Sequence, residues 1–180
     1  DIVQAVTEAN AGRDPRGLCL KLNKLRQNPF AFLRGTCQRY YQALPDQGWT
    51  GDAPVAWLCG DLHLENFGAC RNAKGKARLD INDFDAATLA PLSWDVLRLL
   101  SSLRLACRER AWGHEVQDAA CLRLVAMYAQ ALAAAPTLPP GLTSRPLADL
   151  LAKATPGSVQ QQMDGLVHER QGKPRIKIDG

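Results

Sequence analysis

The stretch that begins at Trp94 predicts a helix whose apolar side chains lie almost all round it instead of along one stripe. These apolar residues are Val96, Leu97, Leu99, Leu100, Leu103 and Leu105. A helix that is apolar on every side is normally covered by its neighbours. The chain has 180 residues, of which 46% are hydrophobic, so it is long enough to build a core around such a helix. We therefore expect one central helix with other elements packed around it.

Hydrophobic periodicity and turn residues predict the remaining elements. Further helices are expected over residues 16–27, 32–44, 114–134 and 145–154. Short apolar runs predict strands at residues 55–59, 67–71 and 77–82, with Gly75 in a hairpin turn between the last two. These elements predict an α+β fold that is mostly helical. We expect one domain over residues 1–135, followed over residues 136–180 by a linker, a short helix and the start of a further segment.

Acidic residues gather in two short stretches, CGDLHLENFG at residues 59–68 and LDINDFDAA at residues 79–87. Asp61 comes directly after a predicted strand and a glycine that permits an unusual backbone angle. Asn66 follows five positions later, and Asp83 comes just after the second strand of the predicted hairpin. Because the hairpin returns the chain from Asn66 to Asp83, we expect Asp61, Asn66 and Asp83 to lie close together.

Oxygen ligands grouped in this way favour a magnesium site. Clustered carboxylates repel one another unless a cation lies among them. Mg²⁺ usually binds one or two carboxylates together with substrate phosphates. Asn66 and Asp83 are the predicted ligands, and Asp85 is either a further ligand or a turn residue. The other interpretation, that these acids are only caps and turn formers, is disfavoured because two motifs agree in order and spacing.

Two nearby residues have both a functional and a structural interpretation. His63 is a ligand or a base, or it braces its loop through a hydrogen bond to the backbone, which we favour. Asp95 lies in the first turn of the helix that begins at Trp94, where the helix dipole favours an acid. Alternatively, Asp95 is a buried acid that accepts hydrogen bonds from the backbone of the first motif. The pattern alone leaves both interpretations of Asp95 open.

Composition restricts the partners and the compartment. The net charge of +4 comes from scattered basic residues, so we expect no nucleic-acid partner. No apolar stretch approaches the ~18–20 residues of a membrane span, and the first residues do not resemble a signal peptide. The six cysteines stand singly, without metal-type spacing. We therefore expect a cytoplasmic protein with reduced thiols and no contact with a membrane.

Four motifs resemble, in order and spacing, those of one uncharacterised bacterial family, domain of unknown function 2252. They are NPFAFLRG (28–35), CGDLHLENFG (59–68), LDINDFDAA (79–87) and WDVLRLLSSL (94–103). The resemblance extends from about Lys21 to at least Leu105. The family is in turn similar to the protein-kinase-like superfamily, in particular to aminoglycoside and choline phosphotransferases. This resemblance implies a fold like the larger lobe of a kinase, with a short β-hairpin that carries the catalytic motifs.

The resemblance also implies roles for individual residues. The spacing D-x-x-x-x-N, followed by D-F-D, matches the catalytic parts of kinases. Asp61 would be the catalytic base, Asn66 and Asp83 the metal ligands, and Asp95 the acid that braces the loop. Arg34 belongs to the family signature and is expected to support the site, without a more specific role. The implied cofactors are Mg²⁺ and ATP.

One kinase feature is missing from the sequence. Kinases hold the ATP phosphates with a glycine-rich loop and a strand lysine, but no G-x-G-x-x-G occurs in these 180 residues. The resemblance implies that these parts follow the catalytic motifs in the wider family. We therefore expect this chain to supply only the catalytic-loop half, without an ATP grip of its own.

The sequence thus predicts a magnesium-dependent phosphotransferase that acts on a small-molecule hydroxyl. The alternative is a non-catalytic kinase-like module that binds a nucleotide, a metal or a protein. A metal-dependent phosphoesterase is disfavoured, because the remaining histidines, His114 and His168, lie in no suitable motif. Neither the acceptor nor the oligomeric state follows from the sequence.

Overall fold

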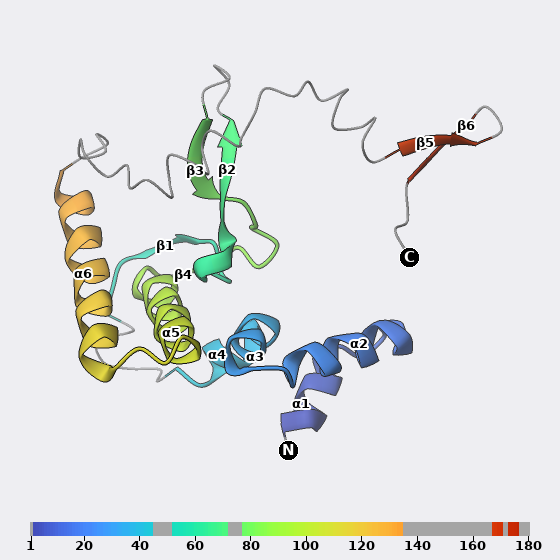
Figure 1. Ribbon diagram of the computed structural model, residues 1–180, viewed down its shortest axis with the longest axis horizontal. Helices are drawn as coiled ribbons and strands as arrows, with labels where there is room; N and C mark the ends of the chain where they lie inside the picture. Colours follow the sequence, from blue (N-terminus) through green and yellow to red (C-terminus); the bar gives the residue numbers. More distant parts are fainter. Residues whose placement is uncertain (1, 45–51, 72–76, 135–166, 171–172, 177–180) are drawn as a thin grey trace. The chain divides into compact units, whose positions relative to one another are not determined.

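The computed structural model describes residues 2–44, 52–71, 77–134, 167–170 and 173–176 (Figure 1). The chain divides into two compact units. The first comprises Asp1–Gly68 and Asp80–Pro140, and the second comprises Ala69–Leu79 and Gly141–Gly180. The predicted domain boundary after residue 135 and the predicted helix 145–154 lie outside the described residues.

Short helices open the first unit. They are α1 (Ile2–Glu8), α2 (Pro15–Leu25), α3 (Pro29–Gly35) and α4 (Cys37–Gln42). Asp14 caps α2 by accepting a hydrogen bond from the Gly17 amide, and Asn28 caps α3 by accepting one from the Ala31 amide, both at 2.7 Å. A proline follows each cap. Backbone N–H groups in the first helical turn have no partner within the helix, so a proline there costs no hydrogen bond.

The prediction of one continuous helix over residues 32–44 is wrong in two respects. The helix begins earlier, at Pro29, because the Asn28 cap and the proline start it there. It is then interrupted at Thr36, whose backbone angles (φ −126°, ψ 40°) leave the helical region. The break separates α3 from α4. The two helices therefore present different side chains to the rest of the first unit.

Two strand pairs hold the acidic motifs. Strand β1 (Val55–Leu58) pairs antiparallel with β4 (Thr88–Pro91), so that Leu58 lies opposite Thr88. Between them the chain runs through the 3₁₀ turn η1 (Leu64–Asn66) and through β2 (Phe67–Arg71), which pairs with β3 (Ala77–Ile81). The two predicted hairpin strands are confirmed, whereas β4 was not predicted. Because β1 pairs with β4, the start of the first acidic motif (residue 59) lies beside the end of the second (residue 87).

Helix α5 (Ser93–Glu109) packs against α3, η1 and α6 (His114–Ala133). The predicted helix is therefore present and central, but its most buried side chains are Asp95, Arg98, Ser102 and Cys107. The leucines and Val96 that were expected to be covered are only half-buried. Residues 95, 98 and 102 are three and four positions apart and share one face of the helix. The buried face of α5 is thus a polar stripe.

The second unit contains a separate two-stranded antiparallel pair. Strand β5 (Val167–Arg170) pairs with β6 (Lys173–Ile176), with Val167 opposite Ile176 and Arg170 opposite Lys173. This hairpin lies in the region where only a linker, a short helix and the start of a further segment were predicted.

The predicted α+β class with a majority of helix is confirmed by these elements. In the part of the chain that the structure describes, no helix has both the length and the apolar character needed to cross a membrane. The cysteines whose side chains are described are free thiols, namely Cys19, Cys37, Cys59, Cys107 and Cys121.

Candidate functional site

The loops that follow β1 and β3 are fastened directly to each other. Gly60 has a φ of +85°, and a Cβ atom at this position would lie 1.8 Å from the carbonyl oxygen of Ala86. Only glycine permits both this angle and this close approach. The backbone amide of Asn82 donates to the backbone carbonyl of Asn66 at 3.2 Å. The Cys59 thiol donates to the backbone carbonyl of Asp83 at 3.1 Å. The first and second acidic motifs therefore form one structural unit.

Asp61 lies in the first of these loops and is held by Arg98 of α5. The Arg98 Nε donates to Asp61 Oδ1 at 2.7 Å, and Nη2 donates to the same oxygen. Asp61 Oδ2 lies 4.0 Å from Nε2 of His63. The Asp61 side chain is 27% exposed, whereas that of Arg98 is completely buried. Oδ1 of Asp61 is thus held by the buried Arg98, while the carboxylate remains accessible to solvent.

Arg98 is the main site residue that the sequence reasoning missed. Besides Asp61, its Nη2 donates to the Leu33 carbonyl of α3 at 2.8 Å, and its guanidinium lies 5.0 Å from the centre of the Tyr40 ring. Arg98 therefore connects α3, α4 and α5 to the loop that carries Asp61. The signal that could have revealed it is the spacing of Asp95, Arg98 and Ser102, which places three polar side chains on one face of an otherwise apolar helix.

Asp95 is buried at the start of α5 and accepts hydrogen bonds from two consecutive backbone amides of the first motif. Cys59 N donates to Oδ2 at 2.7 Å, and Gly60 N donates to Oδ1 at 3.2 Å. The Tyr41 hydroxyl also donates to Oδ1, at 3.3 Å. Burial, reinforced by the Asp95 charge, raises the pKa of Tyr41, so this phenol remains a donor. The structure thus shows the contacts that the bracing interpretation requires, on a residue that also lies in the first helical turn.

His63 is buried and lies directly before η1. Its Nδ1 accepts a hydrogen bond from the Glu65 amide at 3.2 Å, so Nε2 carries the proton and is directed toward Asp61. Burial lowers the pKa of His63, and the neighbouring Asp61 carboxylate partly opposes this. The neutral imidazole shapes the loop through a backbone hydrogen bond. Ser102 of α5 supports the same turn by accepting from the Leu64 amide at 3.2 Å.

Asn66 is nearly fully buried, and its two ends are used differently. The amide nitrogen donates to the Asp61 carbonyl at 3.1 Å, to the Asp83 carbonyl at 3.2 Å and to the Cys59 sulfur at 3.2 Å. These three acceptors define which end is nitrogen, because an oxygen facing two carbonyls would be repelled. The oxygen, Oδ1, is buried and has no hydrogen-bond partner within the described ranges. A buried amide oxygen without a donor is unfavourable and suits a hard cation.

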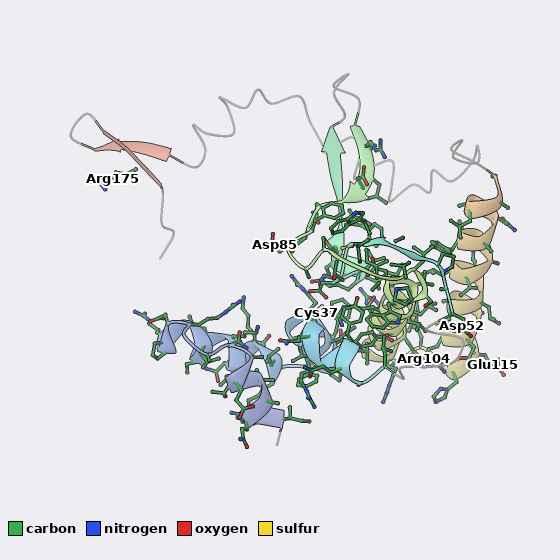
Figure 2. All side chains as sticks on the ribbon, turned by 180° about the vertical axis from the view of Figure 1, so that it is seen from behind. Cys37, Asp52, Asp85, Arg104, Glu115 and Arg175 are labelled. Atoms are coloured by element: carbon green, nitrogen blue, oxygen red, sulfur yellow. The ribbon has the colours of Figure 1, made fainter. Side chains whose placement is uncertain are left out.

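The other predicted metal ligands lie in the second loop. Asp83 is exposed, and its Oδ1 accepts a hydrogen bond from the Asp85 amide at 3.1 Å. Asp85 is also exposed and lies at the outer side of its loop (Figure 2). No three acidic, histidine or cysteine side chains among the described residues are grouped closely enough to hold a metal ion. The donor set therefore fits only a cation that takes few protein ligands, as Mg²⁺ does when phosphates complete its shell.

The site opens into a cavity of about 710 Å³ between α2, α3 and the two loops. Asp61, His63 and Asp83 line one part of it. Lys21, Lys24 and Arg34 line the part formed by the helices. Arg34 forms an ion pair with Glu65, and both side chains are about half exposed. The structure therefore brings Asp61, Asp83 and His63 to one cavity, and it attaches Arg34 to the first motif.

Comparison with known proteins identifies a family but no characterised relative. A family model described as "Uncharacterized protein conserved in bacteria (DUF2252)" matches residues 13–179. No curated protein and no solved structure matches the chain.

Proposed function

The chain belongs to the DUF2252 family, and from this premise and the site geometry we propose that it is a kinase-like phosphotransferase. It transfers a phosphoryl group from a nucleotide, with Mg²⁺, to the hydroxyl of a small molecule. The observation that carries the proposal is the arrangement around Asp61, an accessible carboxylate fixed by a buried arginine beside a buried amide oxygen that lacks a donor.

Asp61 is the proposed base. Arg98 holds Oδ1, so the carboxylate has a defined direction in which to receive the proton of the acceptor hydroxyl. Asp95 fixes the backbone on which Asp61 is mounted, through the amides of Cys59 and Gly60. A base held in this way contributes through orientation, which is the larger part of catalysis in phosphoryl transfer.

Asn66 and Asp83 are the residues that would hold Mg²⁺, and Asp85 lies on the same loop as Asp83. When bound, the ion would neutralise charge on the transferred phosphoryl group. The Asn66 amide nitrogen joins the two loops through the carbonyls of Asp61 and Asp83. It therefore keeps Oδ1 in place independently of any ligand.

A non-catalytic kinase-like module is the second candidate. It is supported by the lack of any G-x-G-x-x-G in the 180 residues and by the use of Asp61 Oδ1 in an ion pair with Arg98. Calorimetry with Mg²⁺ and ATP, run together with a transfer assay, separates the two. Binding of Mg²⁺·ATP without transfer to any hydroxyl or to water would support the module.

The test of the enzyme proposal is the substitution Asp61→Asn in the intact protein, assayed for transfer of the γ-phosphoryl group of ATP to a panel of small hydroxyl compounds. Removal of the base is expected to lower turnover roughly 100-fold or more, while the amide oxygen of asparagine can still accept the hydrogen bond from Arg98, and a circular dichroism melt of the variant checks that it is folded. Asp52→Asn is the control, because Asp52 is exposed and precedes β1. Full activity in Asp61→Asn would contradict the proposal.

A further inference from the structure

A second, smaller cavity adjoins Asp61 and is markedly basic. It has a volume of about 270 Å³ and lies between the segment after α1, helix α2 and the α3–α4 break. Arg13, Lys21, Arg34 and Arg39 line it, and Asp61 is the acid among the lining residues. It shares Lys21, Arg34 and Asp61 with the larger cavity described above.

Asp61 and Arg34 are already paired with an opposite charge, whereas the other three charges that line the cavity are not so paired within the described ranges. Asp61 is paired with Arg98, Arg34 with Glu65, and Arg39 donates to Gln42 at 3.1 Å. For Arg13 and Lys21 the structure shows no carboxylate within ion-pair distance among the residues it describes. Among the described residues, Arg13, Lys21 and Arg39 thus line the cavity without a counter-charge, and of these Arg39 bonds to a neutral amide on its own helix.

Lys21 is held in position for binding. Its Nζ donates to Oδ1 of Asn10 at 3.1 Å, and Asn10 is itself buried and donates to the Val6 carbonyl at 2.6 Å. One of the three ammonium protons is used in this way, and the others are available. Burial and the repulsion of Arg13, partly offset by Asp61, lower the pKa of Lys21. A bound anion would relieve that unfavourable environment.

We propose that this cavity binds an oxyanion, a phosphate or carboxylate group carried by the acceptor molecule, on Lys21 and Arg13. The group is anchored there while a neighbouring hydroxyl of the same molecule reaches Asp61 on the wall of the cavity. The placement of the hydroxyl at Asp61 rests on the proposed function, because the hydroxyl has a role only if a phosphoryl group is transferred to it. The binding of the anion does not depend on that function. It also separates this chain from phosphotransferases that act on aminoglycosides or choline, since a cationic acceptor would meet like charge here.

Binding is tested first, without turnover, by titrating the intact protein with inorganic phosphate and following amide chemical shifts. Saturable shifts are expected around Arg13 and Lys21, and Lys21→Met is expected to weaken phosphate binding about tenfold, the loss of one charge-assisted hydrogen bond. Arg13→Gln, in an exposed segment outside the helices, provides a second variant that leaves the fold intact. Arg16→Gln is the control, because Arg16 is exposed on α2, the helix that carries Lys21, and does not line the cavity.

The outcomes separate the sources of the anion. Equal phosphate affinity in wild type, Lys21→Met and Arg13→Gln would overturn the proposal. Displacement of phosphate by Mg²⁺·ATP would also overturn it, because the cavity would then hold nucleotide phosphates and not the acceptor. Phosphate binding that is unaffected by Mg²⁺·ATP supports it. If phosphate binds in this way but no hydroxyl compound is phosphorylated, the anion site stands and the phosphotransfer proposal fails.

Discussion

At the scale of single residues, the buried arginine explains why Asp61 can be both fixed and accessible. Arg98 is completely buried and uses its Nε and Nη2 donors on Asp61 and on the Leu33 carbonyl. The sequence reasoning placed Asp61, Asn66 and Asp83 in one region because their residue types and spacing carry the signal. It did not find Arg98, because a leucine-rich helix suggests an apolar buried face. Only the packing of α5 shows that its polar stripe is the covered one.

Arg98→Met is expected to destabilise the protein by about 3 kcal/mol, because removal of one partner leaves Asp61 without its counter-charge in a partly buried position. The measurement is urea unfolding of the intact protein. Arg104 (Figure 2) lies on the same helix and forms an exposed ion pair with Asp118. Arg104→Met is therefore the matched control and should cost less than about 1 kcal/mol. Equal losses from the two substitutions would show that Arg98 has no special structural role.

Cys37 provides a pH-dependent test of the packing near Asp61. Its thiol donates to the Gly60 carbonyl at 2.9 Å, and burial raises its pKa to about 11. Because the thiolate is the reactive form, a raised pKa leaves little of it at pH 8. Alkylation of Cys37 should therefore be slow at pH 8 and should accelerate as the pH rises toward about 11.

Peptide mapping by mass spectrometry after timed alkylation measures this rate for each cysteine separately. Cys19, which is exposed on α2, is the internal reference and should react much faster at pH 8. If Cys37 reacted as fast as Cys19 at that pH, the loop would not cover it as described.

At the scale of elements, the site depends on two strand pairs that bring distant segments together. The β2 and β3 strands were predicted from their apolar runs and pair with each other as expected, whereas the predicted turn at Gly75 lies outside the described residues. The β1–β4 pair was not predicted, because Thr88–Pro91 is short, contains a proline and directly precedes a helix. The break at Thr36 was missed although Gly35 and the β-branched Thr36 are both poor helix formers. The pairing of β4, in contrast, is determined by tertiary contacts and not by local preference.

Gly60→Ala is expected to separate the two acidic motifs. The substitution forces a Cβ atom against the Ala86 carbonyl and places a side chain at φ +85°, where the left-handed angle alone costs about 1–2 kcal/mol. A clear loss of thermal stability and of any activity should follow, measured by circular dichroism melting and by the transfer assay. Gly113→Ala is the control, because nothing lies within 4 Å of its added Cβ atom. Identical melting of both variants would contradict the close approach of the loops.

At the scale of the whole molecule, the described site residues and both cavities that adjoin Asp61 belong to the first compact unit. The family match spans residues 13–179 and therefore includes the site as well as α2, whose Lys21 lines the cavities. The fold class and the family could be predicted from the sequence because they depend on periodicity and on motifs. The anion cavity could not, because Arg13, Lys21 and Asp61 meet only after three separate segments have packed.

The claim on which the account depends most is that Asn66 and Asp83 hold a divalent cation beside Asp61. The most direct measurement is titration of the intact protein with Mn²⁺, followed by the electron paramagnetic resonance signal of the free ion, in the wild type, Asp83→Asn and Asp52→Asn. The wild type and Asp52→Asn are expected to bind Mn²⁺ alike, and Asp83→Asn is expected to bind it about tenfold or more weakly. Equal Mn²⁺ binding by all three proteins, or no binding by the wild type, would rule out a cation site on Asn66 and Asp83.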